Sequence, residues 1–161
     1  MFSKHYESKL VKMLKERNLT ISCAESCTAG LVASMIGSVP GASDVFNESY
    51  VTYSNDSKVK ILGVKQETLK EHGAVSHQTA KEMAEGVKKL ADSYVGISVT
   101  GIAGPTGGTI SKPIGLVYIG ISTNKGCTVY KYIFKGPRNV VRYKTAITVL
   151  RKTIQKIEGE I

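Results

Sequence analysis

Cysteine is scarce in this chain of 161 residues, and the spacing of its cysteines and histidines indicates neither a disulfide framework nor a metal site. The sequence contains three cysteines, at positions 23, 27 and 127, without a Cys-x-x-Cys pair. An odd number of isolated cysteines does not build a disulfide framework, so we expect buried thiols. The three histidines, at positions 5, 72 and 77, are not paired at a metal-binding spacing either, and we predict no metal site.

Long apolar runs and low-complexity tracts are also missing. No apolar stretch approaches the roughly 20 residues that cross a bilayer, and residues 1–18 carry charges throughout, unlike a signal peptide. With 42% hydrophobic and 22% charged residues, the composition is typical of a globular protein. We therefore expect one domain over residues 1–161, located in the cytoplasm and without contact with a membrane.

Common nucleotide-binding and catalytic motifs are absent as well. The stretch 101–108, Gly-Ile-Ala-Gly-Pro-Thr-Gly-Gly, lacks the lysine of a P-loop and the spacing of a dinucleotide fingerprint. The chain has no Gly-x-Ser-x-Gly elbow, the usual setting of one class of serine–histidine–aspartate triad. The glycines of 101–108 would let backbone N–H groups approach a ligand, but a plain glycine-rich turn explains them equally well.

Acidic residues are too few to balance the basic ones, and the formal net charge is +9. This charge suggests a nucleic acid or an acidic ligand as partner. From Lys131 onward, eight basic residues are accompanied by only Glu158 and Glu160, without interleaved base-stacking aromatics or a DNA-binding motif. A solvated basic face beside an anionic small ligand is the simpler explanation, so we expect no specific nucleic acid.

Residues 20–37 combine a short apolar run, a polar cluster and a helical pattern. Ile21 and Cys23 alternate as in a strand, and later apolar residues recur at helical spacing. The junction holds Ser26 and Thr28, where the free N–H groups and the dipole of a helix start suit an oxyanion or a phosphate. A simple helix N-cap explains the same hydroxyl residues.

The rest of the chain alternates between helical and strand periodicity. We expect helices over residues 3–17, 55–62, 67–71, 76–90 and 137–156. We expect strands over residues 46–53, 94–100, 115–123 and 127–134, the last two forming a hairpin. Together with the unit at 20–37, these elements predict an α/β fold, a three-layer α/β/α sandwich with a mixed sheet of about five strands.

Three polar junctions, 25–28, 53–58 and 101–108, each follow a predicted strand. Ligands of α/β folds bind at the carboxyl ends of parallel strands, so we expect these junctions to form one site. A hydroxyl nucleophile without a histidine needs another base, and a desolvated lysine can serve if its pKa falls. Lys58 is in the right position, although a solvated helix lysine explains it too.

Several multi-residue motifs from about residue 10 to 150 resemble one family. They are AESCTAG at 24–30, PGAS at 40–43, VTYSNDSK at 51–58, LGV at 62–64, HGAVS at 72–76, and GIAGPTGGT with KPIG at 101–115. In this order they are similar to the C-terminal domain of the CinA (competence- and damage-inducible) proteins. Members that stand alone, as we expect for this chain, are nicotinamide-nucleotide amidohydrolases, so the resemblance implies a single CinA C-terminal-like amidohydrolase domain.

The resemblance implies hydrolysis of the carboxamide of nicotinamide mononucleotide (NMN) in pyridine-nucleotide salvage, giving nicotinic acid mononucleotide and ammonia. No metal or other cofactor is implied. Carried over by motif, Ser26 of AESC is the nucleophile, and Tyr53 and Lys58 of YSNDSK assist it. A neutral Lys58, with Tyr53 as a hydrogen-bonding relay, would take the proton from Ser26.

The resemblance also implies residues that bind the substrate. These are Cys27, Thr28, Gly30, Gly101, Ala103, Gly104, Gly107 and Arg142. The backbone N–H groups at Cys27 and Thr28 would stabilise an oxyanion, while the side chain of Cys27 is expected to pack in the interior. The 5′-phosphate would meet the glycine loop or Arg142, with Arg138 as the second choice. The expected assembly is a homodimer.

One motif departs from the family pattern, because the usual Thr-Gly-Gly after AESC is Thr-Ala-Gly here. Ala29 therefore adds a methyl group to the turn, while the nucleophile is unchanged. Larger CinA proteins carry a further N-terminal domain, whose activity is not expected of this chain. The alternative function is a non-enzymatic basic domain that binds nucleic acid or a partner in competence or DNA-damage responses.

Overall fold

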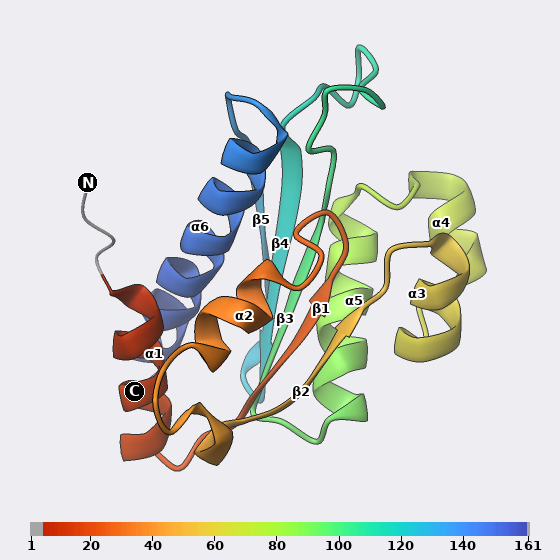
Figure 1. Cartoon of the computed structure of the whole chain (residues 1–161). Helices are drawn as coiled ribbons and strands as arrows, with labels where there is room; N and C mark the ends of the chain where they lie inside the picture. Colours follow the sequence, from red (N-terminus) through yellow and green to blue (C-terminus); the bar gives the residue numbers. More distant parts are fainter. Residues whose placement is uncertain (1–4, 161) are drawn as a thin grey trace.

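Five strands form one mixed sheet in the order β2-β1-β3-β4-β5, in a computed structural model that describes residues 5–160. The strands are β1 (Ile21–Glu25), β2 (Phe46–Val51), β3 (Val95–Gly101), β4 (Leu116–Thr123) and β5 (Gly126–Ile133). β1 runs parallel to both β2 and β3, whereas β3–β4 and β4–β5 are antiparallel. The carboxyl ends of the three parallel strands therefore meet at one edge of the sheet (Figure 1).

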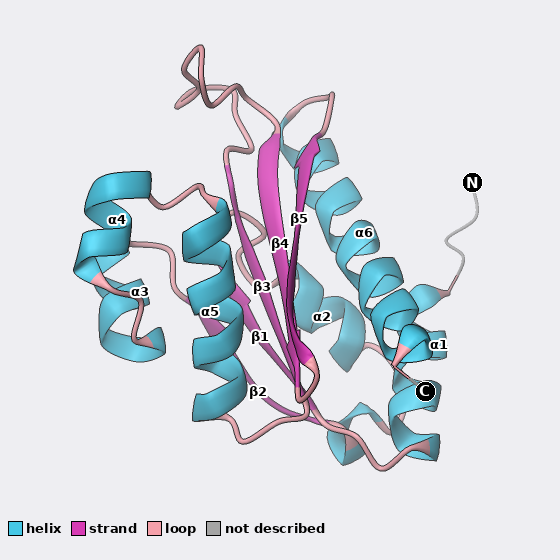
Figure 2. Ribbon diagram, turned by 180° about the vertical axis from the view of Figure 1, so that it is seen from behind, coloured by secondary structure: helices cyan, strands magenta, loops and turns pink. Residues whose placement is uncertain are grey.

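Helices cover both faces of this sheet (Figures 1 and 2). One face carries α1 (Tyr6–Glu16), α2 (Leu31–Gly37) and α6 (Arg138–Gly159), which pack against one another. The other face carries α5 (His77–Leu90), with α3 (Asn55–Leu62) and α4 (Gln66–His72) packed against it. A short 3-10 helix, η1 (Ala42–Asp44), precedes β2. The result is a three-layer α/β/α sandwich.

The connections around β1 create a crevice. The chain leaves β1 through α2 on one face and enters β3 from α5 on the other face, and β2 and β3 flank β1. In open α/β sheets, a crevice that binds ligands forms outside the carboxyl ends of the strands at such a change of direction. The fold therefore places its site where β1 ends.

Apolar periodicity explains why these segments pack as they do. Every residue of β1 is buried, as expected for a central parallel strand. Ala80, Met83, Ala84 and Val87 lie on the buried face of α5, at helical spacing. Gly86 allows α5 to approach α3 closely, because a Cβ there would lie 2.0 Å from the carbonyl oxygen of Leu62.

The predicted α/β/α sandwich with a mixed five-stranded sheet is confirmed. The predicted elements are all present, including the hairpin and the helix after Ser76, whose hydroxyl accepts a hydrogen bond from the Thr79 N–H. The ends of the predicted domain, residues 1–4 and 161, lie outside the described residues, as do the first two residues of the predicted helix 3–17. Among the described residues, no helix combines the length and apolar character needed to span a membrane.

Two of the predicted boundaries that were wrong lie at the site. The strand expected to reach Tyr53 ends at Val51, because the chain turns there to begin α3. The helix expected to start at the Ser26–Thr28 junction begins at Leu31, so residues 26–30 form a turn. Ser26 and Thr28 are therefore not helix caps.

Candidate active site

Ser26 lies directly after β1, between the ends of β2 and β3. Its N–H donates to the Val99 carbonyl oxygen at 3.0 Å, and the Thr52 N–H donates to the Glu25 carbonyl oxygen at 2.9 Å. The pairing of Glu25 with Val51 and Val99 thus continues by one residue on both sides. Alternation along β1 turns Ser26 towards α3 and α5, the side on which Ala24 packs.

Lys58 of α3 reaches Ser26 from this side of the sheet. Its Nζ lies 3.2 Å from Ser26 Oγ and donates to the carbonyl oxygens of Thr52, at 2.7 Å, and Tyr53, at 3.2 Å. The side chain is almost completely enclosed, with 1% of its surface exposed. Ser54 fixes the start of α3 by accepting a hydrogen bond from the Ser57 N–H, and this places Lys58 one turn into the helix. The alternative of a solvated helix lysine is excluded by this burial.

Burial changes the acid–base behaviour of Lys58. Desolvation lowers the pKa of its ammonium from 10.5 to about 8, and nearby Cys27 raises it to a smaller extent. A neutral amine has two N–H donors and one lone pair. The two backbone carbonyls can take both N–H groups of the neutral amine, which leaves the lone pair for the hydroxyl proton of Ser26.

Tyr53 occupies a different position from the one expected of a relay. Its side chain is 56% exposed, and its hydroxyl accepts a hydrogen bond from Arg138 Nη2 at 2.9 Å. The contact between Tyr53 and Lys58 uses the backbone carbonyl of Tyr53. The structure therefore brings Ser26 and Lys58 together, and it brings the backbone of Tyr53 to them but leaves the phenol outside this contact.

Glu25 organises the turn that carries Ser26. Its buried carboxylate accepts hydrogen bonds from the N–H groups of Gly30, Val32 and Ala33, at 2.8–3.1 Å. The first N–H groups of α2 are thus satisfied within the protein, and the positive end of the helix is matched by a fixed negative charge. The N–H groups of Gly30, Val32 and Ala33 at the start of α2 are therefore not free to bind an oxyanion.

The turn itself uses left-handed backbone conformations. Gly30 has φ +91°, and Ala29 has φ +48°. An alanine costs roughly 1 kcal/mol more than a glycine in this conformation. The substitution noted in the sequence motif therefore adds strain to the turn but leaves Ser26 in place.

Cys27 and Thr28 follow Ser26 in this turn. Within the described residues, neither of their backbone N–H groups donates to a backbone carbonyl, and they remain candidates for stabilising an oxyanion. Cys27 is buried, and burial raises the pKa of its thiol to about 11, as expected of a packing residue. Arg142 of α6 holds the turn from the other side, with Nε 3.1 Å from the Cys27 carbonyl oxygen and Nη2 2.8 Å from that of Thr28.

The glycine-rich loop after β3 borders the same region. Ala103 and Gly104 are buried, and Gly104 and Gly107 have positive φ values of +81° and +91°. Arg138 Nη1 donates to the Gly104 carbonyl oxygen at 2.9 Å, so one guanidinium joins this loop to Tyr53. At Gly101, a Cβ would lie 2.8 Å from the Leu116 carbonyl oxygen, so packing against β4 explains this glycine.

Three parts of the site were missed by sequence reasoning. The sequence indicates Glu25 only as a member of the polar junction and Arg138 only as a second choice for a phosphate, and it gives Thr52 no role. The strand pattern was the available signal for Thr52, because an extended register places it beside Ser26. The contacts of Arg138 join segments that are distant in sequence, and those of Glu25 depend on how the turn after β1 folds back.

The described residues contain two buried side-chain polar atoms without a hydrogen-bond partner, and both lie in this region. They are Thr28 Oγ1 and Thr52 Oγ1. Buried hydroxyls are nearly always paired, so two unpaired ones near Ser26 indicate a region arranged for something other than stability. No group of three His, Cys, Asp or Glu side chains in the described residues, at this site or outside it, is placed to hold a metal ion.

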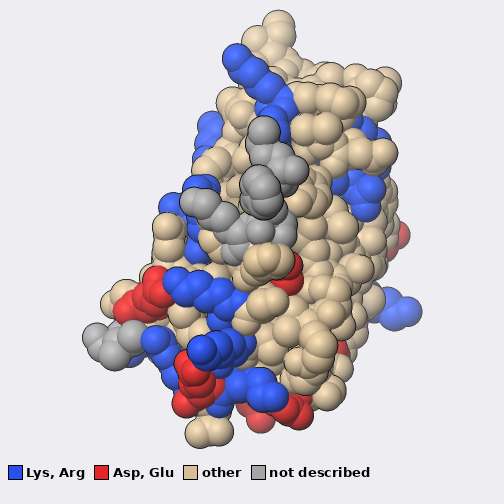
Figure 3. Space-filling model, turned by 60° about the vertical axis from the view of Figure 1, so that its left-hand side comes forward, with Lys and Arg blue, Asp and Glu red and all other residues tan. Residues whose placement is uncertain are grey.

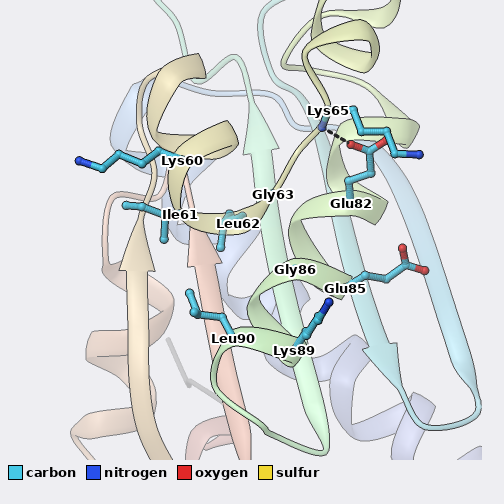
Figure 4. Close-up of a pocket in the computed structure, with 10 residues that line it drawn as sticks. All are labelled: Lys60, Ile61, Leu62, Gly63, Lys65, Glu82, Glu85, Gly86, Lys89 and Leu90. Carbon is cyan, nitrogen blue, oxygen red and sulfur yellow. Dashed lines mark hydrogen bonds between the residues drawn. The ribbon is translucent and has the colours of Figure 1, made fainter.

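A separate groove of about 720 Å³ lies between α3 and α5 (Figure 4). Leu62 and Leu90 line it together with Lys60, Lys65 and Lys89. Glu82 is already engaged there, since it accepts hydrogen bonds from the Lys65 N–H at 2.8 Å and from Thr68 Oγ1 at 2.6 Å. Neither Ser26 nor Lys58 is among the residues that line this groove.

Comparison with known proteins places the chain in a family. The model of the CinA C-terminal domain matches residues 3–157. A CinA-like protein of Endomicrobium trichonymphae is 54% identical over 149 residues, which are 90% of this chain and 35% of that protein. The chain thus spans about a third of the length of the curated relatives it matches, which include competence-damage inducible proteins.

Solved structures agree with this assignment. A competence/damage inducible protein from Agrobacterium tumefaciens has a TM-score of 0.92 and 36% identity, covering 96% of this chain and 97% of that one. A CinA superfamily protein from Klebsiella pneumoniae has a TM-score of 0.94 and 26% identity, with coverage of 98% and 99%. The chain therefore belongs to the CinA C-terminal domain family.

Proposed function

We propose that this protein hydrolyses the carboxamide of NMN, with Ser26 as the nucleophile and Lys58 as its base. The observation that carries the proposal is the buried Lys58 amine 3.2 Å from Ser26 Oγ, with a pKa of about 8. A base with a pKa near neutrality combines a sufficient neutral fraction with useful basicity. The choice of NMN rests on the family resemblance of the motifs around Ser26 and Lys58.

The reaction then proceeds in two halves. Neutral Lys58 accepts the hydroxyl proton of Ser26 while Oγ attacks the carboxamide carbon, giving a tetrahedral oxyanion. The Lys58 ammonium gives this proton to the leaving nitrogen, and ammonia departs. Water then attacks the acyl-enzyme with Lys58 again as base, releasing nicotinic acid mononucleotide and restoring Ser26.

The turn after Ser26 is suited to stabilising the oxyanion. The N–H groups of Cys27 and Thr28 are the donors we assign to it, since the N–H of Ser26 already donates to Val99. Arg142 keeps the turn in place through the carbonyl oxygens of the same two residues. Fixed donors of this kind contribute because they do not reorganise during the reaction.

Binding of the 5′-phosphate is assigned to the glycine loop and α6. Ala103, Gly104 and Gly107 offer backbone N–H groups, and Arg138 and Arg142 supply positive charge beside them. Both arginines already hold protein carbonyls, so a phosphate would share or replace those hydrogen bonds. We further propose that the protein works as a homodimer in the cytoplasm, and sedimentation measurements would test the assembly.

The second candidate is a non-enzymatic domain that binds nucleic acid or a protein partner. It is supported by the net charge of +9 and by the names of relatives, which refer to competence and damage. Against it, basic and acidic side chains are interspersed on the lower part of the face in Figure 3. A dispersed basic surface favours weak binding without sequence preference.

Ammonia release from NMN by the purified protein tests the proposal. We expect turnover in the wild type, with or without a chelator, and a loss of at least about a thousandfold in Ser26→Ala. Ser38→Ala is the matched control, because Ser38 is exposed after α2 and only bonds to the Met35 carbonyl oxygen. Full activity of Ser26→Ala would refute the mechanism, and a wild type that releases no ammonia would refute the function.

A further inference from the structure

Thr52 has a buried hydroxyl for which the described residues, 5–160, provide no partner. The residue is fully enclosed, and its Oγ1 neither donates to nor accepts from any described group. A buried hydroxyl without a partner destabilises the folded state, because it loses its hydrogen bonds to water. Replacement by an apolar side chain would remove this cost, so the hydroxyl calls for an explanation outside stability.

The sheet register places this hydroxyl beside the nucleophile. Carried one residue beyond β1 and β2, the pairing sets Ser26 directly between Thr52 and Thr100. All three side chains point to the α3 and α5 side, since Tyr50, two residues earlier, packs there and Thr100 Oγ1 donates to the Ala74 carbonyl oxygen. Thr100 is thus satisfied by the protein, and Thr52 is the neighbour of Ser26 that is not.

Thr52 is also joined directly to the base. Its backbone carbonyl accepts the shortest hydrogen bond of Lys58 Nζ, at 2.7 Å. Thr52 therefore binds Lys58 through its carbonyl oxygen, and its unpaired hydroxyl lies on the same face of the sheet as Ser26, at the neighbouring register position. A water molecule between Thr52 Oγ1 and Lys58 Nζ would have two polar partners, as buried waters require.

We propose that Thr52 Oγ1 and Lys58 Nζ together position the water that hydrolyses the acyl-enzyme. The inference rests on the proposed serine–lysine mechanism and deepens it. Once Ser26 Oγ carries the acyl group, it no longer offers a proton to Lys58, and the amine lone pair is free to accept one from water. Thr52 Oγ1 makes the second hydrogen bond to that water and so orients the water oxygen towards the ester carbon.

The step balances without any further reactant. The water oxygen forms a bond to the ester carbon, and its proton moves to the Lys58 amine. The bond between the carbon and Ser26 Oγ then breaks, and Lys58 returns the proton to Oγ. The products are a carboxylic acid and free Ser26, and nothing is oxidised or reduced. Thr52 takes no proton in this step and acts as a positioning residue.

Thr28, the other described residue with a buried unpaired hydroxyl, is neither beside Ser26 in the sheet register nor bonded to Lys58. It lies in the turn beyond the strand register, and its carbonyl faces Arg142 of α6, on the opposite layer from Lys58. Thr52 is therefore the residue whose hydroxyl we assign to the second half of the reaction. The proposal requires that its removal slows deacylation and leaves acylation unchanged.

The test separates the two half-reactions with p-nitrophenyl acetate, a simple ester that acylates reactive serines. We expect Thr52→Val to keep the burst of nitrophenolate and to slow the following steady-state rate by about tenfold or more. The acetylated protein should accumulate and be visible as an added acetyl group by mass spectrometry. Thr52→Ser, which keeps the hydroxyl, should deacylate like the wild type.

Two further variants complete the design. Thr52→Ala lacks the hydroxyl as well, so it must deacylate as slowly as Thr52→Val. If the valine variant does not fold, the alanine variant takes its place in the comparison with the wild type. Thr153→Val is the control, because Thr153 is buried in α6 and its hydroxyl is satisfied by the Val149 carbonyl oxygen. Wild-type deacylation in the folded Thr52→Val or Thr52→Ala protein would overturn the proposal, and so would a burst reduced as strongly as the steady state.

Failure of the proposed function gives a different pattern. If the wild type releases no ammonia from NMN but forms an acetyl-enzyme that Ser26→Ala cannot form, the NMN assignment fails. The role of Thr52 is then still decided by the acetyl-enzyme. If Ser26→Ala shows the same burst as the wild type, no acyl group forms on Ser26 and both proposals fall together.

Discussion

At the scale of single residues, Lys58 shows opposite demands of stability and chemistry. Enclosing an ammonium group in the protein disfavours its charge, and this lowers the pKa to about 8. The same shift gives the side chain a neutral fraction that can accept a proton. The carbonyl oxygens of Thr52 and Tyr53 hold the amine in place whichever form it takes.

The depressed pKa predicts a particular dependence of stability on pH. Between about pH 8 and 10.5 the unfolded chain holds the lysine proton more firmly than the folded protein does. Burial of Lys58 therefore lowers the stability of the folded protein. The loss is complete below pH 8, and it becomes smaller as the pH rises to about 10.5. We expect the stability of Lys58→Met relative to the wild type to be greatest below pH 8 and to decline through that window, as measured by urea denaturation.

Measurements of turnover test the role of Lys58 as the base. Lys58→Met should be inactive, and Lys58→Arg should be inactive as well, because an arginine does not give up its proton. Wild-type kcat/KM for NMN should rise with pH and level off above about pH 8, because this ratio reports the pKa values of the free enzyme. An active Lys58→Arg enzyme would identify Lys58 as an electrostatic anchor and would assign the base to another group.

At the scale of elements, the start of α2 is sealed by Glu25. A helix that begins after a strand and turn usually leaves its first N–H groups for a ligand or a capping side chain. Here the last residue of β1 fills that place with its own carboxylate. The geometry of the Ser26 turn is therefore set by a contact between β1 and α2, and these N–H groups are not free to bind an anion.

Replacing this carboxylate should loosen both the helix and the turn. Glu25→Gln exchanges one oxygen for an NH2 group that faces N–H donors, so at least one hydrogen bond is lost. We expect the free energy of unfolding to fall by about 1–3 kcal/mol, with a loss of turnover. Urea denaturation measures the first effect, and ammonia release from NMN measures the second.

Glu67→Gln is the control for this substitution. Glu67 lies in the first turn of α4 and is exposed, so its neutralisation should change stability by no more than about 0.5 kcal/mol. Equal effects of the two substitutions would show that the buried carboxylate has no special role at α2.

At the scale of the whole molecule, charge distinguishes the two candidate functions. A net charge of +9 attracts polyanions whatever the function of the protein is. On the face drawn in Figure 3, Lys and Arg side chains are spread over a wide area. This distribution predicts attraction to DNA through phosphates alone.

We therefore expect DNA binding to be weak, indifferent to sequence and steeply reduced by salt. Fluorescence anisotropy with two labelled duplexes of unrelated sequence, at rising salt concentrations, measures both properties. Tight binding to one duplex at physiological salt would favour the nucleic-acid function over the hydrolase.

The sequence alone was sufficient for the order of helices and strands, because apolar periodicity, caps and turn residues act locally. The hairpin and the cap at Ser76 follow from such signals. The meeting of Ser26 with Lys58 was also foreseen, since parallel strands end at the same edge of a sheet. The motif resemblance named these residues, and the fold explains why they come together.

Tertiary structure decided the rest of the site. Periodicity could not show that Glu25 caps α2, that the hydroxyl of Tyr53 turns to Arg138, or that Arg142 holds the carbonyls of Cys27 and Thr28. Each of these contacts depends on how the chain packs, and those of the two arginines join segments that are distant in sequence. The low pKa of Lys58 has the same origin, because desolvation comes from the residues packed around a side chain and not from its neighbours in sequence.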